Sequence, residues 1–137
     1  AYVVFGRATG WAPALSLSTL DGTTGFRLDG GGLNDRSGVS VATAGDVNGD
    51  GFTDLLVGAS EADPNGTTNA GSTFLVYGRA GAWTPSLALS SLNGSNGMRL
   101  DGTAGQDLSG TSVASAGDVD GDGFSDIVIG AHWADPN

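Results

Sequence analysis

The sequence contains no cysteine, no lysine and only one histidine. Without cysteine the chain can form no disulfide, thiolate zinc site or thiol nucleophile. Five arginines face fifteen acidic residues, which gives a net charge of −10. This charge argues against nucleic-acid binding and against adhesion to anionic membranes, because both need clustered cations. No apolar run approaches the roughly 20 residues of a membrane-spanning helix, so membrane insertion is not expected.

Glycine, in contrast, is abundant, with 25 of the 137 residues. Apolar residues make up 39% of the chain, too many for a disordered segment. This mixture favours short strands joined by tight turns, and the length permits one small domain or a piece of a larger architecture. Because the sequence starts with neither an initiator Met nor a signal peptide, we expect Ala1 to mark a processed or excised start.

An internal repeat organises the chain. When the sequence is shifted by 72 positions, residues 1–65 fall on residues 73–137 without a gap, and 37 of the 65 positions are identical. The segment GDVNGDGFTD, which begins at Gly45, returns as GDVDGDGFSD from Gly117. We therefore expect two copies of one structural unit.

Each unit is predicted to hold four short strands, which in the first unit are residues 26–28, 39–44, 54–59 and 73–77. In residues 39–44, small polar and apolar side chains alternate with a period of two, as in a half-buried strand. Residues 54–59 form an apolar run suited to a strand covered on both faces. Residues 73–77 are rich in β-branched and aromatic residues, which favour strands. One helical turn is indicated within residues 11–20. The chain is predicted to be all-β.

The repeat also predicts how the chain divides into sheets. Residues 1–24 are expected to form a fourth-type strand and a connection, and residues 25–78 a complete blade of four antiparallel strands. A second connection (79–96) then leads to three strands of another blade (97–137). A blade that lacks a strand exposes unpaired N–H and C=O groups.

We expect the first strand of a neighbouring chain to fill that edge, since shared blades can close a propeller ring. Each chain would contribute two blades. The predicted partner is therefore the chain itself, in a homotrimeric ring of six blades or a homotetrameric ring of eight. The alternative is that the sequence is a fragment of a longer chain.

An acidic loop in each unit has oxygen-bearing side chains at positions 1, 3, 5 and 9. Ligands at this spacing let a tight loop wrap a hard cation, and the main-chain carbonyl of position 7 adds another oxygen. The spacing predicts about one Ca²⁺ per blade, because Mg²⁺ demands a tighter octahedron and retains its water. The predicted ligands are Asp46, Asn48, Asp50, the Phe52 carbonyl and Asp54 in the first loop, and Asp118, Asp120, Asp122, the Phe124 carbonyl and Asp126 in the second.

Two other calcium motifs do not fit these loops. An EF-hand needs a bidentate Glu at position 12, where the loops have Val57 and Ile129. A nonapeptide β-roll needs a sustained nine-residue period, which the sequence lacks. The remaining alternative is a solvated acidic turn without an ion, in which neighbouring carboxylates repel one another.

The segments GVSVATAGDVNGDGFTDLLVGA (38–59) and GTSVASAGDVDGDGFSDIVIGA (110–131) resemble FG-GAP repeats, the blades of the β-propeller of integrin α-subunits and of its bacterial relatives. The resemblance implies a propeller with structural calcium ions, and an extracellular or cell-surface, adhesive module of a larger secreted parent. Two features depart from the family. Its propellers are usually seven-bladed within one chain, and the excess length of the 72-residue unit lies in the connection from Arg79 to Asn96.

Ligand binding is the alternative to a purely structural role. Trp11 and Trp83 recur once per unit, and they either cap the core between blades or stack on sugars or peptides. His132 and Trp133 differ from the residues at the same positions of the first unit. A carbohydrate- or peptide-binding propeller, with a glycan or protein ligand, would use these residues on one face of the ring.

Catalysis is not indicated by the sequence. His132 is the only histidine, and no G-x-S-x-G elbow or similar framework accompanies it. The paired aspartates are better explained by a metal ion than by a glycosidase cleft. Asp35 and Asp107 are expected to form turns. Arg27 and Arg99 are expected to pair with the neighbouring carboxylates.

Overall fold

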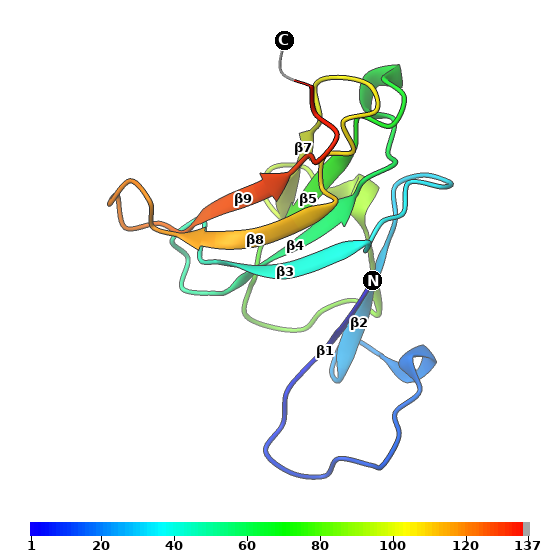
Figure 1. Ribbon diagram of the computed structural model, residues 1–137. Helices are drawn as coiled ribbons and strands as arrows, with labels where there is room; N and C mark the ends of the chain where they lie inside the picture. The colour runs from blue at the N-terminus through cyan, green and yellow to red at the C-terminus, as the bar shows by residue number, and fades with distance from the viewer. Residues whose placement is uncertain (136–137) are drawn as a thin grey trace.

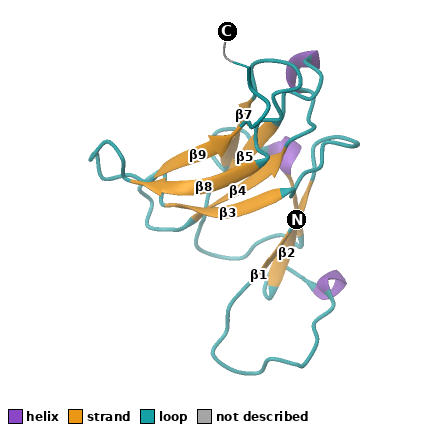
Figure 2. Ribbon diagram, in the orientation of Figure 1, coloured by secondary structure: helices purple, strands orange, loops and turns teal. Residues whose placement is uncertain are grey.

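The computed structural model describes residues 1–135, which form nine strands and three single-turn 3-10 helices (Figure 2). The strands are β1 (Tyr2–Val4), β2 (Gly25–Asp29), β3 (Ser40–Gly45), β4 (Asp54–Ala59), β5 (Ser72–Val76), β6 (Ser86–Ala88), β7 (Gly97–Asp101), β8 (Ser112–Gly117) and β9 (Asp126–Gly130). The helical turns are η1 (Leu17–Thr19), η2 (Pro64–Gly66) and η3 (Leu89–Ser91). The prediction of an all-β chain is confirmed. None of these helical turns is long and apolar enough to span a bilayer.

The strands of the described residues form three sheets (Figure 1). The central sheet has the order β3-β4-β5-β7, with antiparallel neighbours throughout. A second sheet has the order β1-β2-β6, in which β1 is antiparallel and β6 parallel to β2. The third sheet is the antiparallel hairpin β8-β9.

The two repeat units pair their strands in the same register. β1 pairs with β2 through Val3 and Phe26, as β5 pairs with β7 through Leu75 and Met98, 72 residues further along. The hairpins β3-β4 and β8-β9 correspond in the same way. The chain therefore contains one full blade, the two outer strands of a preceding blade and the two inner strands of a following one.

The full blade differs from the predicted division. The sequence assigned it to residues 25–78, but the structure builds it from strands between residues 40 and 101. β2 is not part of it, because β1 and β6 occupy its two edges, and β7 fills the outer edge of β5. Of the predicted segment 97–137, two strands rather than three remain for the next blade; residues 136 and 137 lie outside the described part. In a repetitive chain the boundary can be drawn after any strand, so periodicity does not decide it.

Both faces of the central sheet are buried. Alternate side chains of β4 and β5 point to opposite sides of the sheet, and each side is packed against an apolar cluster. The cluster on the β2 side consists of Phe26, Leu28, Val57, Ala59, Ala62, Phe74, Val76 and Leu89. The cluster on the β8 side consists of Ala44, Leu56 and Leu75, with Val113 and Ile127 packed against it. This two-sided burial explains the uninterrupted apolar sequence of β4 and confirms that it is covered on both faces.

The long connection between β5 and β7 is structured. Trp83 stacks on Phe26 with ring centroids 4.2 Å apart and an interplanar angle of 6°. β6, which the sequence analysis did not predict, then extends the β1-β2 sheet through Arg27 and Ser86. Trp83 therefore caps the core between two blades, which is one of the two roles predicted for it. The predicted helical turn within residues 11–20 is η1, and η3 is its counterpart in the second unit.

Leu56→Ala tests the central core, with Leu33→Ala as its matched control. Leu56 is fully buried, whereas Leu33 is 94% exposed. We expect Leu56→Ala to lower the free energy of unfolding by about 2–5 kcal/mol and Leu33→Ala to change it by less than about 0.5 kcal/mol. Urea denaturation followed by circular dichroism measures both values. Equal effects of the two substitutions would contradict the assignment of the core.

Candidate metal centre

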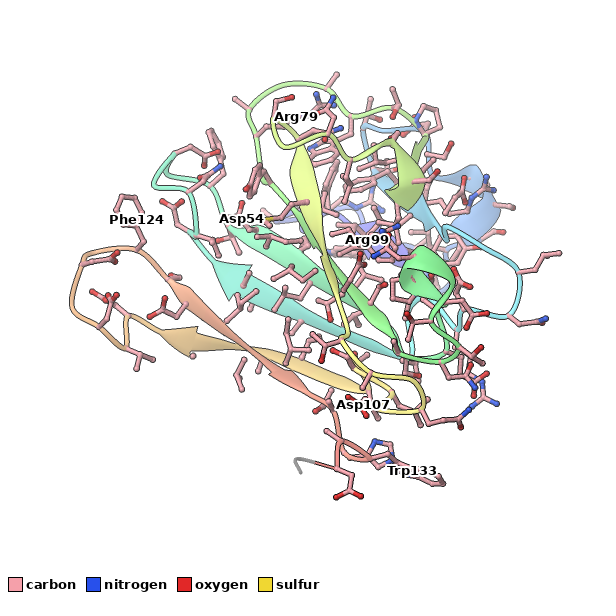
Figure 3. The ribbon with its side chains drawn as sticks, turned by 90° about the horizontal axis from the view of Figure 1, so that it is seen from above. Asp54, Arg79, Arg99, Asp107, Phe124 and Trp133 are labelled. Atoms are coloured by element: carbon pink, nitrogen blue, oxygen red, sulfur yellow. The ribbon has the colours of Figure 1, made fainter. Side chains whose placement is uncertain are left out.

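The two acidic loops connect β3 to β4 and β8 to β9 and lie side by side. The Ser125 N–H donates to the Asp46 carbonyl at 3.0 Å, and the Asp46 N–H donates to Ser125 Oγ at 3.2 Å. A side chain at Gly49 would collide with the Phe124 ring. Figure 3 shows Phe124 at the tip of the β8-β9 hairpin, on the same side of the molecule as Asp54. The sheets therefore present their two most acidic segments together.

The aspartate at position 1 organises each loop. Asp46 Oδ1 accepts the N–H groups of Gly49 at 2.8 Å and Asp50 at 3.1 Å, and Oδ2 accepts that of Gly51 at 2.9 Å. Asp118 accepts the three corresponding bonds in the second loop at 2.8, 3.1 and 2.9 Å. Gly49 and Gly51 have φ values of 76° and 86°, a left-handed conformation that favours glycine. Converging backbone N–H groups thus hold each carboxylate in place.

Positions 3 and 5 repeat this pattern in both loops. The oxygen of position 3 accepts the N–H of position 5 at 3.0 Å in the first loop and 3.1 Å in the second. Oδ1 of position 5 accepts the N–H of position 7 at 2.9 Å in both. The residues concerned are Asn48 and Asp120 at position 3, Asp50 and Asp122 at position 5, and Phe52 and Phe124 at position 7. The predicted side-chain ligands are therefore held by the backbone of their own loop.

Position 9 is buried to different degrees in the two loops. Asp54 is fully buried. Its Oδ2 accepts the Val47 N–H at 2.9 Å, and its Oδ1 accepts the Gly78 N–H at 2.8 Å. Asp126 is half-buried and accepts the first of these bonds, from Val119, at 2.7 Å. The bond from Gly78 ties the first loop to the end of β5.

The second loop gathers three predicted ligands closely. One carboxylate oxygen from each of Asp118, Asp120 and Asp126 lies within 4.8 Å of the other two. Asp122 is outside this close group. Carboxylates this near to one another repel unless a cation lies between them, and oxygen donors are what Ca²⁺ prefers. The residues present therefore fit a calcium ion.

The first loop carries one negative charge fewer, because its position 3 is an amide. Asn48 Nδ2 donates to Asp50 Oδ2 at 2.9 Å. The backbone bonds to the side chains at positions 1, 3 and 5 are alike in the two loops. The two loops are thus the same framework with different charge.

The residues predicted for ligand binding do not converge on one site. Trp11 is exposed, whereas Trp83 is packed in the core between blades. His132 and Trp133 have ring centroids 5.9 Å apart, and Figure 3 shows Trp133 beyond the end of β9 opposite Phe124. The sequence analysis missed one contact, because an arginine four residues earlier lies over each repeated tryptophan, at 4.8 and 4.6 Å from the ring centroid. The recurring G-R-A-x-x-W spacing was the signal for it.

The arginines of β2 and β7 pair as predicted. Arg27 binds Asp29, and this hydrogen bond lowers the pKa of the Asp29 carboxyl. Arg99 Nε lies 2.6 Å from Asp101 Oδ1. Both arginines are exposed and both aspartates are half-buried, and ion pairs this close to solvent contribute little to stability.

Asp35 and Asp107 lie in the loops between β2 and β3 and between β7 and β8. Both neighbours of each aspartate have positive φ, with values of 68° and 54° around Asp35 and 72° and 54° around Asp107. Both aspartates therefore lie in turns, as the sequence predicts.

Comparison with known proteins agrees with this geometry. The FG-GAP repeat family matches residues 37–76 and 109–137, which include both acidic loops. Integrin alpha-6 of Gallus gallus is 32% identical over 106 residues, which cover 77% of this chain and 9% of that protein. Integrin alpha-6 of Homo sapiens is 31% identical over 108 residues (79% and 9%), and integrin alpha-4 of Xenopus laevis 32% over 114 residues (80% and 10%). The chain spans about a tenth of the length of these relatives.

Asp54→Ala and Asp50→Ala separate the structural role of a loop aspartate from its role as a ligand. Without calcium, we expect Asp54→Ala to lower the free energy of unfolding by about 2–4 kcal/mol, because it leaves the N–H groups of Val47 and Gly78 without an acceptor. Asp50→Ala removes the acceptor of the exposed Phe52 N–H, which can bond to water instead, so it should lower the free energy of unfolding by less than about 1 kcal/mol. Thermal and urea denaturation in EDTA measure both. An Asp54 variant as stable as the Asp50 variant would contradict this role of Asp54.

Proposed function

Because the chain belongs to the FG-GAP repeat family, we propose that it is a non-enzymatic, calcium-binding β-propeller module with a structural and adhesive role. The observation that carries the proposal is the common organisation of the two acidic loops, in which the same backbone N–H groups hold the side chains at positions 1, 3 and 5. We propose one Ca²⁺ per loop, held by the side chains of positions 1, 3, 5 and 9 and the carbonyl of position 7.

Calcium would stabilise the blades through charge. Each loop joins two neighbouring strands of a blade, and the second gathers three carboxylate oxygens within 4.8 Å. A bound cation offsets their repulsion, and binding that favours the folded state adds to its stability. Since Ser125 links the backbones of the two loops, an ion in either loop would also stiffen the contact between adjacent blades.

The same arrangement argues for a structural rather than a catalytic ion. Protein oxygens at five positions of one loop fill much of a calcium shell and leave little room for a substrate. A role in recognition would then fall to the loops at the surface of the propeller. A glycan or protein ligand at Trp11, His132 or Trp133 stays a prediction, as does the extracellular or cell-surface setting within a larger secreted parent. We also propose that the module assembles into a closed ring.

Calcium removal tests the proposal directly. At a calcium concentration about 100 times the dissociation constant, each site adds about 2.7 kcal/mol to the free energy of unfolding. The two sites together add about 5 kcal/mol, so we expect excess EDTA to lower the melting temperature by roughly 20 °C. Differential scanning fluorimetry with calcium, magnesium and EDTA measures this shift, and magnesium should restore it poorly.

The control is the double variant Asp46→Asn/Asp118→Asn. It keeps one acceptor oxygen at each position 1 but removes both charges and the acceptors of the Gly51 and Gly123 N–H groups. Its melting temperature should therefore be lower than that of the wild type in EDTA and should respond much less to calcium. A wild-type melting temperature that EDTA leaves unchanged would show that the loops hold no stabilising ion.

Exchanging the residues at position 3 tests the role of charge. Asn48→Asp gives the first loop the ligand set of the second, and Asp120→Asn does the reverse. One added carboxylate near the ion is worth about 1 kcal/mol in water, so we expect calcium affinity to rise by roughly fivefold in Asn48→Asp and to fall by a similar factor in Asp120→Asn. Isothermal titration calorimetry measures both. If the wild type and both variants bound calcium with the same affinity, the side chain at position 3 would not be a calcium ligand.

A further inference from the structure

Several apolar side chains of residues 1–24 are exposed although their counterparts 72 residues later are buried. Leu17 is 44% exposed, whereas Leu89 is 1% exposed. Tyr2 and Val4 of β1 are likewise exposed, and their counterparts in β5 belong to the cluster on the β2 side of the central sheet. The second unit thus shows which surface these side chains cover when a preceding blade is in place.

The other end of the chain also exposes apolar side chains whose counterparts in the first unit are buried. Val128 of β9 is 53% exposed, whereas its counterpart Leu56 is fully buried. Met98 of β7 is exposed, whereas its counterpart Phe26 lies beneath Trp83. Met98 lacks the cover that β5 and the connection after it give to Phe26. Val128 lacks the cover that Leu75 of β5 and the hairpin β8-β9 give to Leu56.

These two exposed surfaces are the two halves of one core. In the cluster on the β2 side, Phe26 packs with Phe74 and Leu89. Its counterparts are divided between the ends of the chain, with Met98 at one end and Tyr2 and Leu17 at the other. We propose that residues 1–24 of a second copy of this chain complete the blade that β8 and β9 begin. This inference names the partner of the propeller proposed above and rests on that proposal.

The edges of the strands fit this arrangement. Within the described residues, β9 is paired on its β8 side only, and β1 on its β2 side only. Leu56 of β4 pairs with Leu75 of β5, so the same antiparallel register places Val128 opposite Val3 of the second copy. The pairing satisfies two open edges and covers Val128 at the same time.

A second contact follows from the connection. β6 runs parallel to β2 with Ser86 opposite Arg27, next to the stacking of Trp83 on Phe26. The corresponding segment of the second copy, residues 14–16, would run along the free edge of β7, with Ala14 opposite Arg99. Trp11, which is exposed in this chain, would then cover Met98.

The contact requires no refolding, because β1 is already paired with β2 on its other edge. It joins different surfaces of the two copies, so it is a head-to-tail contact that forms a ring if the rotation closes. Each copy adds two blades, and propellers typically have four to eight. The rings of six or eight blades expected from the sequence need three or four copies.

The native mass in millimolar calcium, by light scattering on a sizing column, tests the inference. We expect three or four times the chain mass of 13.5 kDa. Leu17→Lys places a charge in the proposed core, and Val128→Lys places one where β9 would pair with Val3 of the second copy. The two substitutions act from opposite sides of the contact, and both variants should be monomeric. Leu33→Lys, at a side chain that is 94% exposed and outside the proposed contact, should keep the wild-type mass.

Mixing the two monomeric variants tests the head-to-tail direction. Leu17→Lys keeps its β9 surface, and Val128→Lys keeps its residues 1–24, so one intact contact can form between them. The mixture should give a dimer of about twice 13.5 kDa and nothing larger. A mixture that stays monomeric, or a wild-type chain of 13.5 kDa, would overturn the inference.

The melting temperature separates this inference from the proposed function. Both monomeric variants should keep the circular dichroism of the wild type and its stabilisation by calcium. A monomeric wild-type chain that calcium still stabilises would overturn the self-assembly alone. A chain that calcium does not stabilise would overturn the proposed function whatever its mass.

Discussion

The central blade depends on the burial of both faces of its sheet. β4 and β5 alternate between two apolar clusters, with Val57 on one side and Leu56 on the other. A single unit cannot supply both covers, because each face is packed by strands of a neighbouring unit. β1 and β2 cover one face and β8 and β9 the other, so the stability of this blade is a property of the repeat rather than of one segment.

The acidic loops are the electrostatic counterpart of this packing. Backbone N–H groups converge on Asp46 and Asp118 and hold these carboxylates in place by hydrogen bonds that need no bound ion. Negative charge is thereby concentrated at one end of the hairpins, where the loops of adjacent blades touch through Ser125. A cation at this end would act on the same contact between blades that the apolar clusters stabilise from within.

Much of the local structure could be predicted from the sequence. The predicted strands at residues 39–44 and 54–59 agree with β3 and β4 to within one residue at each end, since their periodicity and turn residues are local signals. The places of the two acidic loops, between β3 and β4 and between β8 and β9, could also be predicted from spacing, and the role of their side chains as calcium ligands stays a prediction. β6 could not be predicted, because residues 86–88 have no distinctive pattern and become a strand only through the edge that β2 offers.

The repeat, the all-β class and the acidic loops follow from short-range spacing and composition, so they can be read from the amino-acid order. Which strands share a blade and which side chains are buried depends on contacts between segments far apart in the chain. Leu56 and Val128 occupy the same position of the repeat, yet one is fully buried and the other exposed. Their difference lies in whether another pair of strands covers them. Burial depends on neighbours in space, and a repeated sequence specifies the surface of each unit without specifying what lies against it.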